Sequence, residues 1–308
     1  MTDPKRLLAI GLPHAGKTTF LAALWHVAES REVPQALTLR IISDEAKYLN
    51  AIRNDWLKCI PAVRTTRSAE QSASLHFDDQ YEQHIGEVVF PDLSGETFQT
   101  QWKYRHWTTD YQVLVENADS LLVFFNAGKI KEPWPISAVQ RMAQSAGVED
   151  IDEQDTACPA TNDQPQATSN NSEWTPEAVP TQVQLVGLLQ FIQPFILKKA
   201  PIRIAVLVSA WDIISKEGWN KYDAPDVWLS KRLSYFHQFL VSNKEHFSFK
   251  VYGISAQGGD FENEEDRQRL RSCQHASERI QIEGPDCMPH DITEPIRWAL
   301  RLRDAAGS

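Results

Sequence analysis

The stretch "GLPHAGKTTFLAALWH", residues 11–26, decides the fold class expected for this chain. It matches the pattern GxxxxGK[ST] at Gly11, Gly16, Lys17 and Thr18. A short apolar run before it, "RLLAIGL" (6–12), is typical of a buried parallel strand. Apolar residues at helical spacing follow the glycines, so we expect a helix over 17–30. A strand, a glycine loop and a helix in this order are typical of a phosphate-binding loop.

Strand and helix patterns alternate along the rest of the chain. Strands are expected at 37–43, 72–79, 86–92, 119–128, 202–212 and 249–257. Helices are expected over 44–59, 98–117, 181–199, 225–244 and 291–304, the last with Asp291 as its N-cap. This alternation implies crossover connections, so we predict an α/β fold with a mainly parallel central sheet and helices on both faces. Residues 1–308 are expected to form a single domain.

The composition narrows the classes of function. The chain has 308 residues, 42% of them hydrophobic, which is enough for a well-buried core. Its net charge of −10 argues against a surface that holds nucleic acid or anionic lipid. The cysteines show no metal-ligand spacing, and no apolar run is long enough to cross a bilayer. We therefore expect a cytoplasmic protein with no membrane and no direct nucleic-acid partner.

The segment 145–180 differs sharply from its surroundings. It is packed with Asp, Glu, Asn, Gln, Ser, Thr and Pro, and Trp174 is its only aromatic residue. Such a segment buries too little apolar surface to offset its chain entropy. It is interpreted as a disordered acidic insertion within the domain, and docking of a partner is the alternative.

Ligands of a parallel sheet bind beyond the carboxyl ends of the strands, and polar motifs follow the apolar runs there. After the first strand, backbone N–H groups would surround a β-phosphate, Lys17 would neutralise β- and γ-oxygens, and Thr18 would ligate Mg²⁺. The residues assigned to nucleotide binding in this loop are Gly11, His14, Ala15, Gly16, Lys17, Thr18 and Thr19.

A second motif, "DLSG", follows the strand expected at 86–92. Asp92 can hold Mg²⁺ through water. Gly95 lets the backbone approach a γ-phosphate closely enough for its N–H to donate there. The alternative is a turn with an aspartate cap.

Two further strand ends carry the base-reading signals. "IRIAVLV" runs into "SAWD", and "FKVYGI" runs into "SAQ". Here the chain resembles the Ras-like (TRAFAC-class) P-loop GTPases, whose [NT]KxD and SA[KL] motifs read guanine. The resemblance implies that Asp212 accepts hydrogen bonds from guanine N1 and N2, and that Ser255 and Ala256 form the second motif, with the Ala256 N–H at O6. Ser209 and Ala210 depart from the pattern.

Within that class, the phosphate loop, the acidic insertion and the terminal "HDITEPIRWAL" look like the double-GTPase family of bacterial conflict systems. The resemblance implies a GTP/GDP- and Mg²⁺-dependent component of antiviral defence. It also implies a protein partner, either a second GTPase or an effector.

The resemblance assigns two further catalytic positions. A switch threonine should contact Mg²⁺ and the γ-phosphate, and "AVRTTRS" offers Thr65 and Thr66, of which Thr66 is preferred. Arg64 and Arg67 beside them are either a cis arginine finger or solvated loop residues. Glu96 stands where relatives carry the water-orienting glutamine, so slow intrinsic hydrolysis is expected.

The segment after Glu96 is rich in aromatic residues, Trp102, Tyr104, Trp107 and Tyr111. They could anchor a partner or pack against the sheet, and packing is preferred.

The sequence thus predicts a slow, magnesium-dependent GTPase that switches its affinity for a protein partner. One alternative is a scaffold that binds nucleotide without hydrolysing it. The other is a P-loop ATPase or small-molecule kinase.

Overall fold

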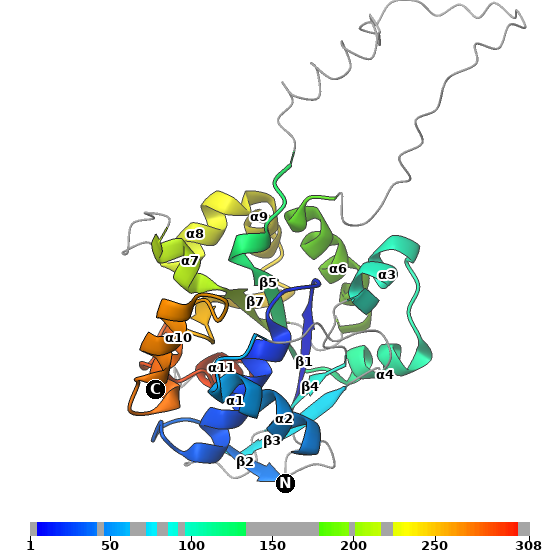
Figure 1. Cartoon of the computed structure of the whole chain (residues 1–308). Coiled ribbons are helices and arrows are strands. Elements are labelled where there is room, and N and C mark those ends of the chain that lie inside the picture. Colours follow the sequence, from blue (N-terminus) through cyan, green and yellow to red (C-terminus); the bar gives the residue numbers. More distant parts are fainter. Residues whose placement is uncertain are drawn as a thin grey trace, which may run out of the picture.

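The structure, a computed structural model, describes residues 5–41, 46–61, 72–78, 86–91, 96–133, 179–196, 201–216 and 224–300. Figure 1 shows a central sheet with helices packed around it. Of the helices described, none is long and apolar enough to span a membrane.

The sheet has eight strands in the order β2-β3-β4-β1-β5-β6-β7-β8. The strands are β1 (Lys5–Gly11), β2 (Thr38–Ile41), β3 (Ala73–Asp78), β4 (Gly86–Phe90), β5 (Ser120–Asn126), β6 (Ile202–Ser209), β7 (Phe247–Ser255) and β8 (Gln281–Glu283). The pairs from β4 through β1, β5 and β6 to β7 are parallel. The pairs β2-β3, β3-β4 and β7-β8 are antiparallel. The prediction of a mainly parallel sheet is therefore confirmed.

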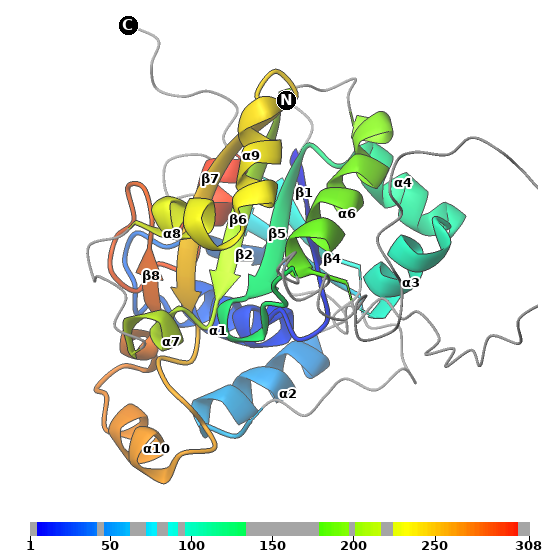
Figure 2. The ribbon, with the colours of Figure 1, turned by 90° about the horizontal axis from the view of Figure 1, so that it is seen from above.

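Helices cover both faces of this sheet, as Figure 2 shows from above. One face packs against α1 (Lys17–Ser30), α2 (Ala46–Leu57), α10 (Glu264–Arg271) and α11 (Glu294–Leu300). The other packs against α3 (Glu96–Tyr104), α4 (Thr109–Asn117), α6 (Thr181–Ile196), α7 (Trp211–Lys216), α8 (Pro225–Arg232) and α9 (Ser234–Ser242).

The strand β1 explains why the sheet can be covered on both sides. Leu7 and Ala9 belong to the core under α1, whereas Leu8 and Ile10 belong to the core on the opposite face. All four are fully buried. Side chains alternate along a strand, so an uninterrupted apolar run supplies both layers at once.

Two long helices expected from the sequence are each broken in the structure. The expected helix at 98–117 is wrong as a single element, because α3 ends at Tyr104 and α4 begins at Thr109. Arg105 between them has a left-handed φ of 52°, and the Thr108 hydroxyl caps α4 by accepting the Tyr111 N–H at 3.3 Å. The expected helix at 225–244 divides at Leu233, whose φ and ψ of −126° and 53° are not helical.

Two other expected elements have different bounds. The strand expected at 202–212 stops at Ser209, and Trp211 opens α7. The last helix begins at Glu294 rather than directly after Asp291. Asp291 still organises its start, because the Asp291 Oδ1 accepts the Thr293 N–H at 3.0 Å.

The two ends of the long connection between β5 and α6 are joined by hydrogen bonds. The Thr181 N–H donates to the Lys131 carbonyl at 3.0 Å, and the Lys131 N–H donates to the Thr181 hydroxyl at 2.9 Å. Apart from Val179 and Pro180, the predicted acidic insertion at 145–180 lies outside the described residues.

Candidate functional site

The glycine loop between β1 and α1 turns twice through left-handed backbone. His14 has φ 58°, and Gly16, directly before α1, has φ 82°. A side chain at residue 16 would also clash, since a Cβ there would lie 2.9 Å from the Ser209 Oγ. The cap residue Gly16 has no side chain that could accept a hydrogen bond from the start of α1. The N–H groups of the first turn of α1 therefore remain able to donate to a ligand.

Lys17 lies buried under this loop, with 2% of its surface exposed. Its Nζ donates to the Gly11 carbonyl at 2.9 Å and to the Leu12 carbonyl at 3.3 Å. It also lies 5.3 Å from the ring centroid of Phe98 in α3. The ammonium group is therefore held at the loop, where it contributes a positive charge.

Gly11 is required by the sheet itself. A Cβ at this residue would lie 2.7 Å from the Phe124 Cβ on the neighbouring strand β5. The first glycine of the motif therefore allows β1 and β5 to pair closely at the edge where the loop begins.

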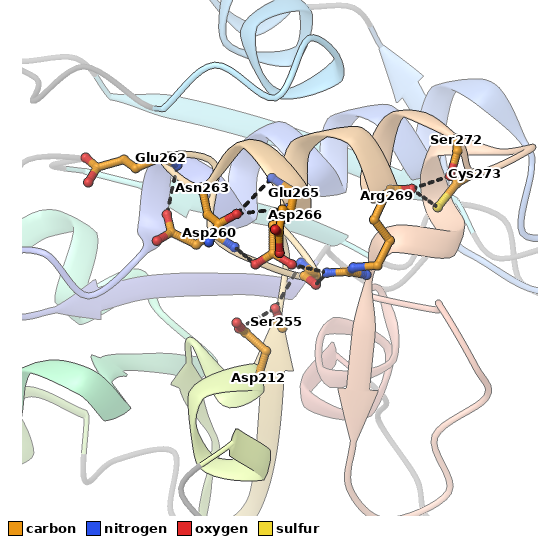
Figure 3. Close-up of polar contacts among 11 residues, drawn as sticks. Asp212, Ser255, Asp260, Glu262, Asn263, Glu265, Asp266, Arg269, Ser272 and Cys273 are labelled. Atoms are coloured by element: carbon orange, nitrogen blue, oxygen red, sulfur yellow. Dashed lines mark hydrogen bonds and ion pairs between the residues drawn. The ribbon is translucent and has the colours of Figure 1, made fainter.

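Asp212, in the first turn of α7, meets Ser255 at the end of β7, as Figure 3 shows. The Ser255 hydroxyl donates to the Asp212 Oδ1 at 2.6 Å and accepts the Gly258 N–H at 3.0 Å. Ser255 is itself buried, with 1% exposed. It fixes the orientation of the carboxylate and starts the turn at residues 255–260, which we call the base loop.

The phosphate loop and the base loop line one cavity of about 300 Å³. Its wall includes Gly16 and Thr19 on one side, and Asp212, Ser255 and Ala256 on the other. This volume lies at the lower end of the range typical of small-molecule sites. The structure thus brings together two motifs that lie more than 190 residues apart in the sequence.

Ser209, which replaces the Asn or Thr of the related motif, also lines this cavity. Its Oγ is buried and has no hydrogen-bond partner among the described residues. Buried hydroxyls are rarely left unsatisfied, so this atom indicates a ligand or water beside Gly16.

Asn126, at the end of β5, is a site residue that the sequence analysis missed. Its Nδ2 donates to the His14 carbonyl at 3.2 Å, and its Oδ1 accepts the Gly128 N–H at 2.8 Å. It lines the cavity and braces the phosphate loop from the neighbouring strand. Its place as the last residue of a buried parallel strand is the signal that could have identified it.

Trp211 anchors the helix turn that presents Asp212. Its indole Nε1 donates to the Glu283 Oε2 at 2.9 Å. A Cβ on Gly253 would lie 2.3 Å from the Trp211 ring, so only glycine at this position of β7 admits the indole. Ala210 before it has a left-handed φ of 56°.

The helix α10 holds the base loop from outside, as the dashed lines in Figure 3 show. The Asp260 N–H donates to the Asp266 Oδ2 at 2.9 Å, and the Arg269 guanidinium donates to the Gly258 carbonyl at 2.9 Å. Asp266 and Arg269 also pair with each other at 2.9 Å.

Several predicted catalytic residues lie outside the described part of the chain. They are Thr66, Asp92 and Gly95, together with Arg64, Thr65 and Arg67. The backbone of Glu96 opens α3, and its side chain is outside the description. Among the described residues no group of three or more His, Cys, Asp or Glu could hold a metal ion. Of the predicted Mg²⁺ ligands, only Thr18 is described, in the first turn of α1.

Three of the four aromatic residues after Glu96 pack against other parts of the molecule, Tyr111 buried and Trp102 and Trp107 partly buried. The Trp107 ring lies 4.2 Å from Phe191 in α6, centroid to centroid, and Tyr111 is 5% exposed. A Cβ on Gly187 of α6 would lie 2.5 Å from the Trp102 Nε1, so Trp102 also rests on this helix. Tyr104 is 64% exposed and remains available to a partner.

Comparison with known proteins gives one family. Residues 8–299 match the model of a family described as Double-GTPase 1. No curated protein matches the sequence significantly.

Three solved structures show weak similarity in fold. The signal recognition particle receptor SRb-GTP/SRX complex from Chaetomium thermophilum has 11% identity over 83% of this chain and 92% of that chain, with a TM-score of 0.37. The bacterial selenocysteine-specific elongation factor EF-Sec has 9% identity over 90% of this chain and 30% of that chain, with a TM-score of 0.33. Nucleolar GTP-binding protein 1 from Plasmodium falciparum has 12% identity over 87% and 86%, with a TM-score of 0.32. All three scores are low, and the family rests on the sequence match alone.

Proposed function

Because this chain belongs to the Double-GTPase 1 family, we propose that it binds GTP with Mg²⁺, hydrolyses the nucleotide slowly and uses it to control its affinity for a protein partner. Family membership supports GTP binding. The observation that carries the proposal is the shared cavity, in which Gly16 and Thr19 of the phosphate loop face Asp212, Ser255 and Ala256 of the base motifs.

The phosphate loop would hold the phosphates through backbone N–H groups of residues 14–19. Left-handed backbone at His14 and Gly16 forms a concave array of such groups, and the N-terminus of α1 adds its positive dipole. Lys17, now held by loop carbonyls, would turn its charge to the β- and γ-oxygens.

The base loop would select guanine. The Asp212 carboxylate, oriented by Ser255, would accept hydrogen bonds from guanine N1–H and the 2-amino group, which adenine cannot donate in the same way. The Ala256 N–H would donate to O6. Ala210 supplies no long side chain to cover the base, so contact there is reduced relative to the [NT]KxD pattern.

Hydrolysis would depend on residues around the γ-phosphate. Thr18, Thr66 and Asp92 would hold Mg²⁺, which when bound supplies charge neutralisation between the β- and γ-phosphates. The Gly95 N–H would donate to the γ-phosphate, and Glu96 would orient the attacking water. A carboxylate at residue 96 would place negative charge near the phosphate and would slow the reaction.

The output would be a nucleotide-dependent surface near 61–70 and 94–110, contacted by a second GTPase or an effector of a bacterial defence system. In this proposal residues 1–308 act as one cytoplasmic GTPase domain. Tyr104, exposed at the end of α3, is the described residue in these ranges best suited to anchor such a partner.

Exchange of Asp212 tests the guanine site. Asp212→Asn should weaken GTP binding by about 10- to 100-fold, because hydrogen bonds to a charged acceptor contribute about 1.5–3 kcal/mol. The same variant should gain affinity for xanthosine triphosphate, whose O2 can accept from the new amide. Isothermal titration measures both affinities, and Asp226→Asn on the exposed surface of α8 is the matched control. An unchanged preference among GTP, ATP and xanthosine triphosphate would overturn the proposal.

The scaffold alternative is favoured by one observation, the glutamate at residue 96. Single-turnover hydrolysis of bound GTP separates the two functions. Slow phosphate release that speeds up in Glu96→Gln supports a GTPase, whereas no release with or without this substitution supports a scaffold.

A further inference from the structure

The base loop has a second support, and it comes from a helix outside the nucleotide motifs. Trp56, in the last turn of α2, is 3% exposed. Its indole Nε1 donates to the Ala256 carbonyl at 2.9 Å. Ala256 lines the cavity, whereas Trp56 stands behind it.

Two arginines beyond the base loop hold the end of α2 in place. The Arg279 guanidinium lies over the Trp56 ring, with its Cζ 5.6 Å from the ring centroid, and donates to the Leu57 carbonyl at 3.1 Å. The Arg271 guanidinium donates to the Lys58 carbonyl at 2.7 Å. Arginines at a helix C-terminus satisfy its last carbonyls and complement its dipole, so Trp56 sits on a fixed platform.

The backbone is held by hydrogen bonds on both sides of the Ala256 N–H. Before it, the Ser255 Oγ accepts the Gly258 N–H and fixes the turn. After it, Trp56 fixes the Ala256 carbonyl. With constraints on both sides, the direction of the N–H between them is set before any ligand arrives, which is preorganisation of a donor.

From this arrangement we propose that Trp56 is a positioning residue that aims the Ala256 N–H at guanine O6 and so contributes to base selectivity. This inference rests on the proposed function. Trp56 does not touch the ligand, and its effect passes through one backbone hydrogen bond.

Nucleotides that differ at position 6 test the inference. Trp56→Phe keeps most of the ring and removes the indole N–H. We expect GTP affinity to fall by about 3- to 10-fold, the range that corresponds to one hydrogen bond of about 0.5–1.5 kcal/mol. Inosine triphosphate, which keeps O6 and lacks the 2-amino group, should lose the same factor. The triphosphate of 2-aminopurine riboside, which lacks O6, should change by less than about twofold.

A matched control comes from another tryptophan, which donates a hydrogen bond to α2. Trp25 in α1 is 1% exposed, and its Nε1 donates to the Asn50 Oδ1 at 3.1 Å. Trp25→Phe therefore removes a buried indole hydrogen bond to α2 without touching the base loop. Its affinities for all three nucleotides should stay at the wild-type values, whatever its thermal stability.

A second variant leaves Trp56 intact. Arg279→Gln removes the guanidinium that lies over the indole and should, like Trp56→Phe, lower the affinity for GTP relative to that for the 2-aminopurine riboside triphosphate. Equal loss of all three nucleotides in both variants, or the same selectivity change in Trp25→Phe, would overturn the inference alone. A wild-type chain that binds no guanine nucleotide would overturn the proposed function as well.

Discussion

At the scale of single residues, the polar groups at the cavity depend on supporting hydrogen bonds from neighbouring side chains. Asp212 is oriented by Ser255, and the His14 carbonyl is held by Asn126. The first hydrogen bond is partly buried and the second is exposed, and both have ordinary lengths of 2.6 and 3.2 Å. A substitution in such a support is expected to change nucleotide affinity more than it changes folding.

Asn126 gives the first prediction. Asn126→Ala removes a donor to the His14 carbonyl and an acceptor for the Gly128 N–H, so GDP affinity should fall by about 3- to 10-fold. Asn126→Asp keeps the acceptor, loses the donor and adds a charge near the phosphates, so its affinity should fall further. Titration with GDP checks the order. An aspartate variant that binds as well as wild type would contradict it.

The pair of buried His26 and partly buried Glu32 predicts how stability depends on pH. The His26 Nε2 lies 3.2 Å from the Glu32 Oε2. Burial lowers the pKa of His26 below its ordinary 6.5, although the hydrogen bond and charge of Glu32 oppose this shift. The folded chain therefore binds fewer protons than the unfolded chain near and below pH 6.5.

Because the unfolded chain binds more protons, the free energy of unfolding falls as the pH falls. Stability contributed by neutral His26 is present above pH 6.5 and is lost as the pH falls from there through the lowered folded-state pKa. Urea unfolding of His26→Gln should show a smaller loss of free energy between about pH 7.5 and pH 5.5 than the wild-type chain. Parallel pH profiles for the two proteins would contradict this assignment.

At the scale of elements, the position of Asp212 depends on how α7 packs against β7. The strand β7 and the helix α7 meet at Gly253, where the Trp211 ring rests on bare backbone. Gly253→Ala would place a methyl group 2.3 Å from that ring, and overpacking of this kind costs about 1–3 kcal/mol.

The expected result of Gly253→Ala is a displaced α7 with Asp212 out of position. GTP affinity should fall by about tenfold or more, while affinity for inorganic triphosphate, which needs only the phosphate loop, should hold within about twofold. Competition titrations against a labelled nucleotide measure both. Ser248→Ala, on an exposed position of the same strand, is the control. Equal losses for both ligands would show that the damage is general.

These elements also show how far the sequence could predict the structure. The helix Lys17–Ser30 has the predicted bounds, because the motif fixes its start and the apolar run that follows ends at Ala28, just before polar residues. The break between α3 and α4 lies at the left-handed Arg105, and the packing of Trp102 and Trp107 on α6 on either side of it has no local signal in the sequence. The same reason explains why Trp56 went unrecognised, because it acts through Ala256 and one sequence alone does not reveal that the two residues meet. Asn126 had a signal in its place at the end of a buried parallel strand, but its contact with the His14 carbonyl is again a long-range one.

At the scale of the whole molecule, the site exists only when the sheet is complete. Gly16 lies in the loop after β1 and Ala256 directly follows β7, yet both line one cavity. The order of strands, β4-β1-β5-β6-β7 in the middle, brings their carboxyl ends together. The alternation of strand and helix patterns in the sequence predicted that these carboxyl ends share one edge, because strands joined by helical crossovers run parallel. The roles of Thr66, Asp92, Gly95 and Glu96 stay predictions.

Deletion of the long connection between β5 and α6 tests whether the domain needs it. We expect a chain with 134–178 replaced by a short Gly/Ser linker to fold and to bind GDP within about twofold of wild type, because Lys131 and Thr181 already hold the ends together. Closing a shorter flexible loop costs less, by roughly 0.6 kcal/mol per halving of its length, so the melting temperature should stay equal or rise. Scanning calorimetry with and without GDP checks both. A sharp drop in melting temperature would mean that the segment contributes to the core.

The hydrogen bonds between Lys131 and Thr181 have one more consequence, for the history and the engineering of this protein. Because they hold the ends of the connection together, the length of the connection can change without changing the geometry of the cavity. Evolution can therefore recruit, trim or exchange whole recognition modules at this junction while the nucleotide chemistry is inherited unchanged. A laboratory can use the same junction to install a fluorescent reporter.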